Sequence, residues 1–105
     1  MYKIELSPQA IDDLKEIKSY IEDELQNSIA AKNTLLKIVE TYESLSTFHN
    51  LGIPVQKYVS FSTDYRFILA NNYSIFYRIE DKTIKVVRIL YSRRDFVNIL
   101  FGENK

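Results

Sequence analysis

The stretch YRFILANNYSIFYRIEDKTIKVVRILY, residues 65–91, decides the fold, because two short polar breaks divide it into three strand-like runs. The runs are rich in β-branched and aromatic residues and lie at 65–70, 73–80 and 83–91. The breaks are Asn71-Asn72 and Asp81-Lys82, and asparagine tolerates the positive φ of a two-residue hairpin turn. We therefore predict an antiparallel meander of three strands.

Turns of two residues also fix the register of the strands. The expected pairs are Ala70–Tyr73, Ile68–Ile75, Arg66–Tyr77, Glu80–Thr83, Tyr77–Val86 and Ile75–Arg88. One face then carries Arg66, Ile68, Tyr73, Ile75, Tyr77, Ile79, Ile84, Val86, Arg88 and Leu90, and the other carries Tyr65, Phe67, Leu69, Phe76, Arg78, Val87, Ile89 and Tyr91. Both faces are apolar. If helices cover one, the other should stay partly open as a concave surface for a partner.

The residues before the meander predict a strand and two helices. YKIEL at 2–6 alternates like a strand, and Ser7-Pro8 is a helix start, with serine as N-cap and proline at the first helical position. Two apolar stripes follow: Ile11, Leu14, Ile17, Ile21 and Leu25 in a helix over about 8–25, and Ala31, Leu35, Ile38, Tyr42 and Leu45 in a helix over about 28–47. The short break between them, with Asn27 or Ser28 as the next N-cap, predicts an antiparallel hairpin packed on the sheet.

The remaining segments complete a single α+β domain over 1–105. We expect a loop at 48–54, an ambiguous segment with room for one short strand at 55–64, and a short helix over about 93–101 that ends before Gly102. The order is β-α-α-β-β-β followed by the short C-terminal helix, with the helical hairpin packed on an antiparallel sheet. A chain of 105 residues suffices for one such core.

Composition excludes several classes of function. The chain has no cysteine, one histidine and two glycines, so disulfides, thiol chemistry, a histidine-rich metal site and a glycine-rich phosphate loop are not expected, and neither is a cofactor. No signal peptide or membrane-spanning run is visible, which favours the cytoplasm. Net charge is zero, although residues 1–56 hold five basic against nine acidic residues and residues 57–105 hold nine against five. The second half is therefore the better candidate for contact with acidic groups.

The residues left for chemistry are arginines and aromatics near VVRILYSRRDF, 86–96. The candidate partner-binding residues are Arg66, Arg78, Arg88, Tyr91, Arg93, Arg94 and Phe96. Guanidinium groups bind carboxylates and phosphates, so the set fits either a partner protein's acids or RNA cleavage without a metal. Cleavage would use Arg66, Tyr91, Arg93 and Arg94, with Tyr91 and Asp95 as the nearest proton-transfer groups. We expect a basic recognition edge first and a catalyst second, with Asp95 pairing one of the neighbouring arginines.

The order of elements and several motifs resemble the RelE/ParE toxin superfamily of bacterial type II toxin–antitoxin modules, also known as plasmid stabilisation proteins. The resemblance covers nearly the whole chain and rests on SPQAIDDLKEIKSYI (7–21), HNLGIP (49–54), YRFILANNYSIFYRI (65–79) and VVRILYSRRDF (86–96). It implies a RelE/ParE-like fold and a cognate antitoxin as partner in a hetero-oligomer. The antitoxin's C-terminal segment is expected to lie across apolar toxin surface as a helix or added strand.

The superfamily divides by mechanism. RelE-like members cut mRNA in the ribosome with basic residues and a C-terminal tyrosine, whereas ParE-like members are associated with inhibition of DNA gyrase. Arg66 and Arg93 match basic positions of the nuclease branch, but Ile68, Ser74 and Ile99 stand where it has lysine, arginine and tyrosine. The chain is therefore closer to the ParE branch, although Tyr91 and Ser92 replace the usual His and Gly of that branch. A gyrase-directed, non-enzymatic toxin is the leading expectation, with a metal-independent mRNA interferase and a decayed, non-toxic antitoxin-binding domain as alternatives.

Overall fold

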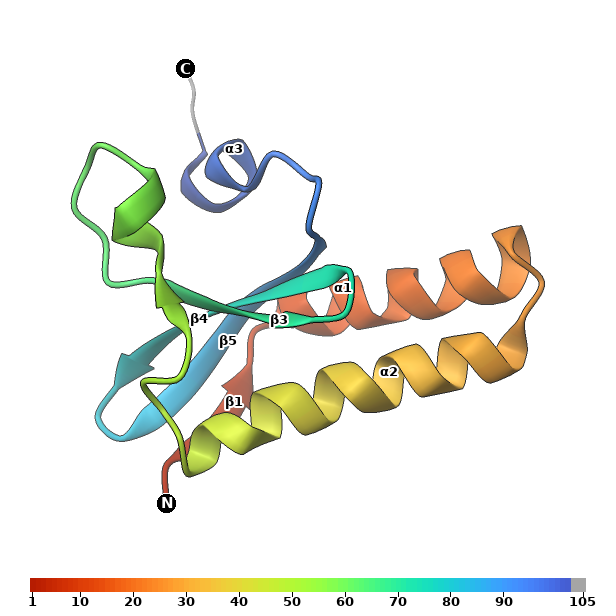
Figure 1. The fold of residues 1–105 in the computed structure, drawn as a ribbon, viewed down its shortest axis with the longest axis horizontal. Coiled ribbons are helices and arrows are strands. Elements are labelled where there is room, and N and C mark those ends of the chain that lie inside the picture. Colours follow the sequence, from red (N-terminus) through yellow and green to blue (C-terminus); the bar gives the residue numbers. More distant parts are fainter. Residues whose placement is uncertain (103–105) are drawn as a thin grey trace.

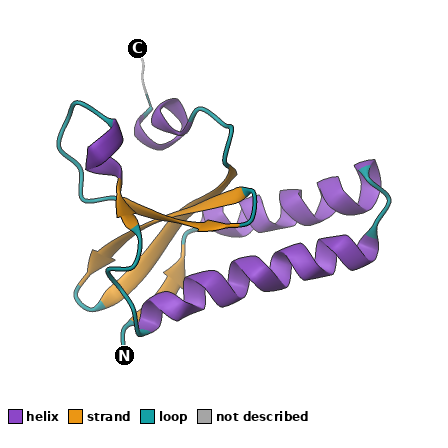
Figure 2. Cartoon of the chain, viewed as in Figure 1, coloured by secondary structure: helices purple, strands orange, loops and turns teal. Residues whose placement is uncertain are grey.

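The computed structural model describes residues 1–102 as a five-stranded sheet with a helical hairpin on one face (Figure 1). The elements are β1 (Lys3–Leu6), α1 (Pro8–Ser19), the π-helical turn η1 (Tyr20–Glu24), α2 (Ser28–Glu43), the 3₁₀ turn η2 (Ser44–Ser46), β2 (Ile53–Pro54), the 3₁₀ turn η3 (Val55–Tyr58), β3 (Arg66–Ala70), β4 (Tyr73–Glu80), β5 (Thr83–Tyr91) and α3 (Phe96–Phe101). Figure 2 shows α3 and η3 on the side of the sheet away from the hairpin. The predicted α+β class and order are confirmed, and β2 is an addition within the expected loop.

Both helices of the hairpin begin at the residues that their capping chemistry indicates. Ser7 Oγ accepts a hydrogen bond of 3.0 Å from the Ala10 N–H, and Pro8 is the first helical residue. Asn27 Oδ1 accepts one of 2.9 Å from the Ala30 N–H. The first helix continues from α1 through the π-helical turn to Glu24, close to the expected end, and α2 tightens into η2 from residue 44.

The sheet has the strand order β1-β5-β4-β3-β2. Strands β3, β4 and β5 pair antiparallel, as predicted, and β2 adds a short antiparallel pair with β3. β1 joins β5 in parallel, which makes the whole sheet mixed. Asn71, Asp81 and Lys82 have φ values of 54°, 51° and 59°, as tight hairpin turns require. The predicted pairs that are present are Ala70–Tyr73, Ile68–Ile75, Arg66–Tyr77, Glu80–Thr83 and Tyr77–Val86.

A β-bulge changes the register in the last part of β5. Val87 is an extra residue between the pair Tyr77–Val86 and the pair Phe76–Arg88. Because side chains alternate along a strand, one extra residue moves every later side chain to the opposite face.

The predicted Ile75–Arg88 pair is therefore wrong, because Ile75 pairs with Ile89. Ile89 joins the core beneath the hairpin, whereas Leu90 packs on the other face of the sheet. The sequence-based assignment of these two residues to faces is reversed by the bulge.

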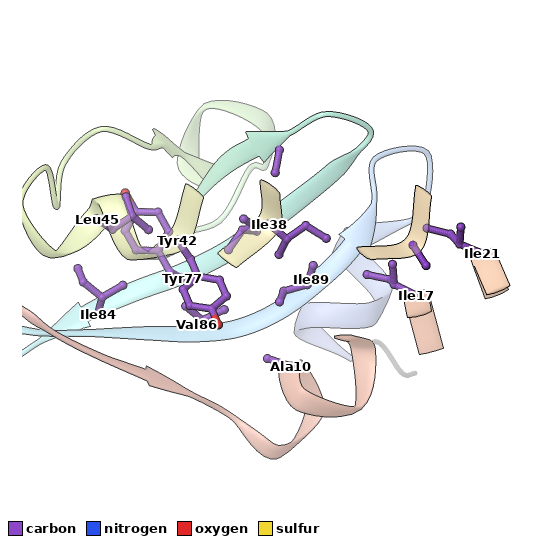
Figure 3. Close-up of a cluster of buried hydrophobic side chains, with 13 residues drawn as sticks. Ala10, Ile17, Ile21, Ile38, Tyr42, Leu45, Tyr77, Ile84, Val86 and Ile89 are labelled. Carbon is purple, nitrogen blue, oxygen red and sulfur yellow. The ribbon is translucent and has the colours of Figure 1, made fainter. Parts of the chain in front are cut away.

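Two clusters of buried apolar side chains lie on the two faces of the sheet. The larger one, beneath the hairpin, contains Ala10, Ile17, Ile21, Ala31, Ile38, Tyr42, Leu45, Ala70, Ile75, Tyr77, Ile84, Val86 and Ile89. Figure 3 shows Ile38, Tyr42 and Leu45 of the second helical segment beside the strand residues. The smaller cluster joins buried Val55, Phe76 and Leu90 to side chains of α3 and of the segment after η3. Both faces of the sheet are thus partly covered, which fits their apolar sequence.

Three other expectations need correction. Ile11 and Leu25, the two ends of the first stripe, are 43% and 58% exposed, and the hairpin tip that carries Leu25 extends beyond the sheet (Figure 1). Residues 55–64 contain the η3 turn and no strand. The last helix begins at Phe96 instead of residue 93, because Asp95 is its N-cap. No helix within residues 1–102 has the length and apolarity to cross a membrane.

Candidate functional site

A hollow lies on the sheet face opposite the hairpin, between the ends of three strands, η3 and α3. It has a volume of about 240 Å³, and we call it the concave site. Its lining residues are Tyr58, Phe67, Leu69, Ser74, Phe76, Leu90, Tyr91, Ser92, Arg94 and Phe96. Tyr58, Leu69 and Tyr91 are 61%, 54% and 43% exposed. Exposed aromatic and apolar surface with an arginine at its rim is typical of a protein contact.

Three of the predicted site residues meet at the concave site: Tyr91, Arg94 and Phe96. The ring of Phe96 stacks on that of buried Phe76, with centroids 5.3 Å apart. The ring of Tyr91 contacts that of Tyr73 edge-on at 5.9 Å. These contacts position the aromatic side chains without using the Tyr91 hydroxyl.

Arg93 and Arg94 lie in the turn between β5 and α3, and both are exposed. Neither forms an ion pair within residues 1–102. The expected pairing of Asp95 with one of them is wrong, because its carboxylate accepts hydrogen bonds from the backbone and side-chain amides of Asn98, at 3.4 and 2.6 Å. The two guanidinium groups therefore remain available to acids of a partner.

Arg66 lies away from the concave site and holds the loop before β2. Its guanidinium donates hydrogen bonds of 3.2 and 2.8 Å to the carbonyl oxygens of Asn50 and Gly52. Arg66 pairs with Tyr77 of β4, whereas Tyr91 pairs with Tyr73 of the same strand. These two cross-strand rows are therefore four residues apart along β4. At roughly 3.3 Å per residue the two rows are about 13 Å apart. The four candidate nuclease residues therefore do not converge on one point.

Arg78 is engaged at the far end of the same strand. Its guanidinium approaches Asp64 at 3.4 Å and Glu80 at 3.6 Å, and its side chain is 34% exposed. Such exposed pairs contribute little to stability. Arg78 is thus placed with surface charges at the opposite end of β4 from the concave site.

Arg88 forms the one largely buried ion pair among residues 1–102. Its Nε and one terminal nitrogen each donate a hydrogen bond of 2.8 Å to Asp13 of α1, whose side chain is 7% exposed. The Ile89 N–H donates a third, of 2.9 Å, to the same carboxylate. The hydrogen bonds to Asp13 raise the pKa of Arg88 above its ordinary value, against the effect of burial. Arg88 therefore joins α1 to β5 and is occupied.

Sequence reasoning missed Asp13. The signal was its spacing: Ala10, Asp13 and Ile17 lie three and four residues apart on one helix face, and all three are buried. An acid on an otherwise apolar face requires a partner, and a base on the packed strand is the obvious one.

The positions where the sequence departs from the nuclease pattern are buried or partly buried. Ser74 is buried, and its hydroxyl lies 3.0 Å from that of Ser92. Ile99 packs on the smaller apolar cluster, and Ile68 packs on the larger one. None of these three side chains carries a positive charge that binds phosphate, as arginine and lysine do, and none has the phenol that tyrosine uses for proton transfer.

A second cavity, which we call the hairpin cleft, lies where the hairpin extends past the sheet. It has a volume of about 720 Å³ and is lined by Asp13, Glu16, Ile17, Tyr20, Ile21, Leu25, Ala30, Thr34, Asn72, Tyr73, Ile89, Leu90, Tyr91 and Arg94. Burial raises the pKa of Tyr73, and the nearby phenols of Tyr20 and Tyr91 raise it further. No group of three or more His, Cys, Asp or Glu side chains suited to a metal ion occurs within residues 1–102.

Comparison with known proteins gives a consistent result. A family profile described as "ParE toxin of type II toxin-antitoxin system, parDE" matches residues 4–96. A search of curated proteins found no match.

Several solved structures similar to this chain are described as toxin–antitoxin systems or complexes. A chain of the chromosomal ParDE system from P. aeruginosa aligns with a TM-score of 0.72 and 22% identity, over 87% of this chain and 96% of that one. A chain of the RelBE2 complex from Mycobacterium tuberculosis aligns with a TM-score of 0.60 and 20% identity, over 86% and 96%. A chain of the YoeB–YefM complex from Staphylococcus aureus aligns with 0.56 and 28%, over 87% and 97%. The first two likenesses indicate the fold.

Proposed function

The chain belongs to the ParE toxin family of type II toxin–antitoxin systems, and from this premise we propose that it arrests growth by acting on DNA gyrase and is held silent by its cognate antitoxin. The antitoxin follows from the class of system. The choice of gyrase over the ribosome rests on the site.

The observation that carries the proposal is the separation of the basic residues. A metal-independent nuclease must bring phosphate-binding groups and proton-transfer groups to one phosphate. Here Arg66 is hydrogen-bonded to two loop carbonyl oxygens and lies about 13 Å along the sheet from the row of Tyr91. Ser74 and Ile99, at two of the positions where the nuclease branch has functional side chains, are packed. This arrangement supports a binding toxin over an RNA-cleaving one.

The charge of the chain supports the same choice. A ribosome-docking nuclease neutralises many phosphates, which requires a strongly positive surface. This protein has zero net charge at neutral pH. Of the five arginines, three are engaged within the protein and only Arg93 and Arg94 are unpaired within residues 1–102. Two free guanidinium groups beside an apolar hollow suit a protein target better than a long polyanion.

The experiment is a supercoiling assay with purified gyrase and purified toxin. We expect inhibition at micromolar toxin, and relief of the inhibition when purified antitoxin is added. The gyrase proposal would be overturned if the toxin stops growth when its expression is induced in cells but does not inhibit gyrase when it is added as purified protein at micromolar concentration.

The ribosome is the rival target, since RelBE2 and YoeB–YefM complexes share this fold. Primer extension on a translated mRNA distinguishes the two. Cuts within the ribosomal A site, dependent on toxin, would replace gyrase by the ribosome as target. Unimpaired growth on induction without antitoxin would instead favour a decayed domain that retains only antitoxin binding.

A further inference from the structure

A further hollow, which we call the outer groove, lies between the two helices of the hairpin. It has a volume of about 560 Å³ and is lined by Lys18, by Glu22 and by residues of α2 between Ser28 and Val39. It shares no lining residue with the concave site or the hairpin cleft. We propose that two copies of this chain associate through the outer groove, with their α2 helices antiparallel across a twofold axis.

An apolar seam runs along the outer side of α2. Ile29 and Leu36 are 73% and 49% exposed, and Val39 is only partly buried against the core. We call the following residues the outer seam: Ile29, Lys32, Leu36, Val39 and Glu43. They recur at alternating intervals of three and four residues, which is the spacing of a helix that packs lengthwise on another helix. Exposed apolar side chains at this spacing indicate that the partner of α2 is itself a helix.

The charges along the outer side of α2 change sign from one end to the other. Lys32 lies near the beginning of the helix, whereas Glu40 and Glu43 lie in its last turn. None of the three forms an ion pair in the part of the chain that the structure describes. Two antiparallel α2 helices bring the lysine of each copy to the acidic end of the other, whereas a parallel pair would bring like charges together. The outer seam is therefore complementary to a reversed copy of itself, as a twofold contact requires.

The spacing of the outer seam gives the register of the two helices. In an antiparallel pair, the residue numbers of one helix fall as those of the other rise. When Leu36 of one copy faces Val39 of the other, Lys32 of the first copy faces Glu43 of the second. The twofold axis repeats both contacts, so two apolar layers lie between two ion pairs.

The helix dipole makes this distribution of charge unfavourable within a single copy. α2 has no acid in its first turn and no base in its last turn, where the dipole favours a positive charge. A lysine from a second copy beside Glu43 offsets the unfavourable interaction of that acid with the dipole. The other two charged residues at the groove, Lys18 and Glu22, pair with each other at 3.1 Å and do not favour either sign of charge in a partner.

The association leaves the sites described above accessible. The concave site lies on the face of the sheet opposite the hairpin, beside α3 and η3 (Figure 2). A dimer formed through the outer groove therefore presents two concave sites. A nucleic acid is a poor alternative occupant of the groove, because Glu40 and Glu43 repel its phosphates.

Sedimentation equilibrium of the purified full chain, without antitoxin, measures the association. We expect a reversible dimer of twice the chain mass of 12.4 kDa. Leu36→Glu places a charge in both apolar layers and should abolish the dimer. Lys32→Glu places like charges opposite each other at two contacts and should raise the dimer Kd about tenfold or more. Glu43→Lys should have the same effect.

The variant that carries both Lys32→Glu and Glu43→Lys restores opposite charges across the twofold axis and should recover most of the lost affinity. The change at residue 43 agrees with the helix dipole, so it should not lower the Tm of the monomer, and unfolding cannot explain the loss of the dimer. Lys37→Glu is the matched control. It makes the same change of charge at an exposed residue of α2, about 100° around the helix from Leu36, and should leave the Kd unchanged.

Three outcomes would overturn the inference. The first is a wild-type chain that sediments as a monomer at every concentration. The second is a dimer that Leu36→Glu and Lys32→Glu leave intact, or that Lys37→Glu weakens equally. The third is a monomeric toxin whose affinity for purified antitoxin falls in Leu36→Glu, since the groove would then belong to the antitoxin. Gyrase inhibition is not measured in this test, so its result is independent of the proposed target.

Discussion

Arg88 and Asp13 are 75 residues apart in the chain, yet the guanidinium and the carboxylate form two hydrogen bonds of 2.8 Å. The pair lies where β1 stops. β1 pairs with β5 only as far as Val86, and beyond it Ser7 Oγ donates a hydrogen bond of 2.8 Å to the Val87 carbonyl oxygen. Asp13 then accepts the N–H of Ile89 at 2.9 Å. Beyond the end of β1, the hydrogen-bonding groups at this edge of β5 are therefore bound by Ser7 and by Asp13 of α1. The β-bulge lies at the point where β1 ends.

Asp13→Ala is predicted to destabilise the fold by about 3 kcal/mol. The substitution leaves a mostly buried guanidinium and a buried N–H without their acceptor, and removal of one partner of a buried pair typically costs roughly 3–5 kcal/mol. The lower end applies because the Arg88 side chain is 25% exposed. Urea unfolding should show a lower midpoint with an unchanged slope. Asp12→Ala, at the exposed neighbouring acid, is the control and should change stability by less than about 0.5 kcal/mol; equal losses in the two variants would contradict the prediction.

Gly52→Ala is predicted to destabilise the loop before β2 by about 1–3 kcal/mol, the usual cost of overpacking. A Cβ at Gly52 would lie 2.5 Å from the Tyr77 hydroxyl oxygen and 2.8 Å from the Phe67 carbonyl oxygen. The Tyr77 side chain is fully buried, and its hydroxyl accepts a hydrogen bond of 3.0 Å from the Gly52 N–H. Neither atom can move freely, so the loop must shift. Thermal unfolding measures the loss of stability. Gly102→Ala cannot serve as a control, because Gly102 has a φ of 62° and an alanine there would be strained for a different reason.

The stability of the protein is predicted to fall above about pH 10, partly through Tyr42 and Tyr73. Burial raises the pKa of both phenols above the ordinary value of 10.0. When the pH passes the pKa of tyrosine in the unfolded chain, the unfolded chain releases these protons while the folded protein keeps them. The unfolded state therefore becomes more favourable. The contribution of the two phenols to stability is fully present below about pH 10, and it is lost as the pH rises toward their pKa values in the folded protein.

The variant that checks this prediction is Tyr42→Phe, which removes one titrating group from the core. Within residues 1–102 the Tyr42 hydroxyl makes no side-chain hydrogen bond that the substitution would break. Urea midpoints should be compared between about pH 8 and about pH 11. The variant should lose less stability over this interval than the wild type. Identical pH dependence in the two proteins would count against a raised pKa for Tyr42.

Local chemistry in the sequence predicted the elements and most of the register. Two-residue turns at 71–72 and 81–82 fixed the strand pairs, and Ser7 with Pro8 fixed the start of α1. The bulge at Val87 could not be predicted, because no glycine or proline marks it and the residue that binds its carbonyl oxygen, Ser7, is distant in the sequence. That single extra residue accounts for the reversed faces of Ile89 and Leu90.

The candidate site was predictable in composition but not in arrangement. Tyr91, Arg94 and Phe96 lie together because they follow one another at the end of β5. Arg66 and Arg88 carry the same guanidinium group but are engaged by loop carbonyl oxygens and by Asp13. Which arginine is free depends on contacts between distant segments, and residue type alone does not contain that information.

Tyr91→Phe is predicted to leave growth arrest unchanged within about twofold, because the ring of Tyr91 contacts Tyr73 edge-on at 5.9 Å and needs no hydroxyl for that contact. If the hydroxyl instead transferred a proton in RNA cleavage, its loss would reduce the rate by roughly 10²-fold or more. Colony counts after induction without antitoxin measure the effect. Tyr91→Ala is the companion variant: it removes the ring from the wall shared by both cavities and should weaken growth arrest. A toxin that is disabled by Tyr91→Phe as fully as by Tyr91→Ala would contradict the prediction and show that the hydroxyl is required, either for proton transfer or for a hydrogen bond to the target. Primer extension on a translated mRNA would then separate these two roles, because only proton transfer in RNA cleavage produces cuts.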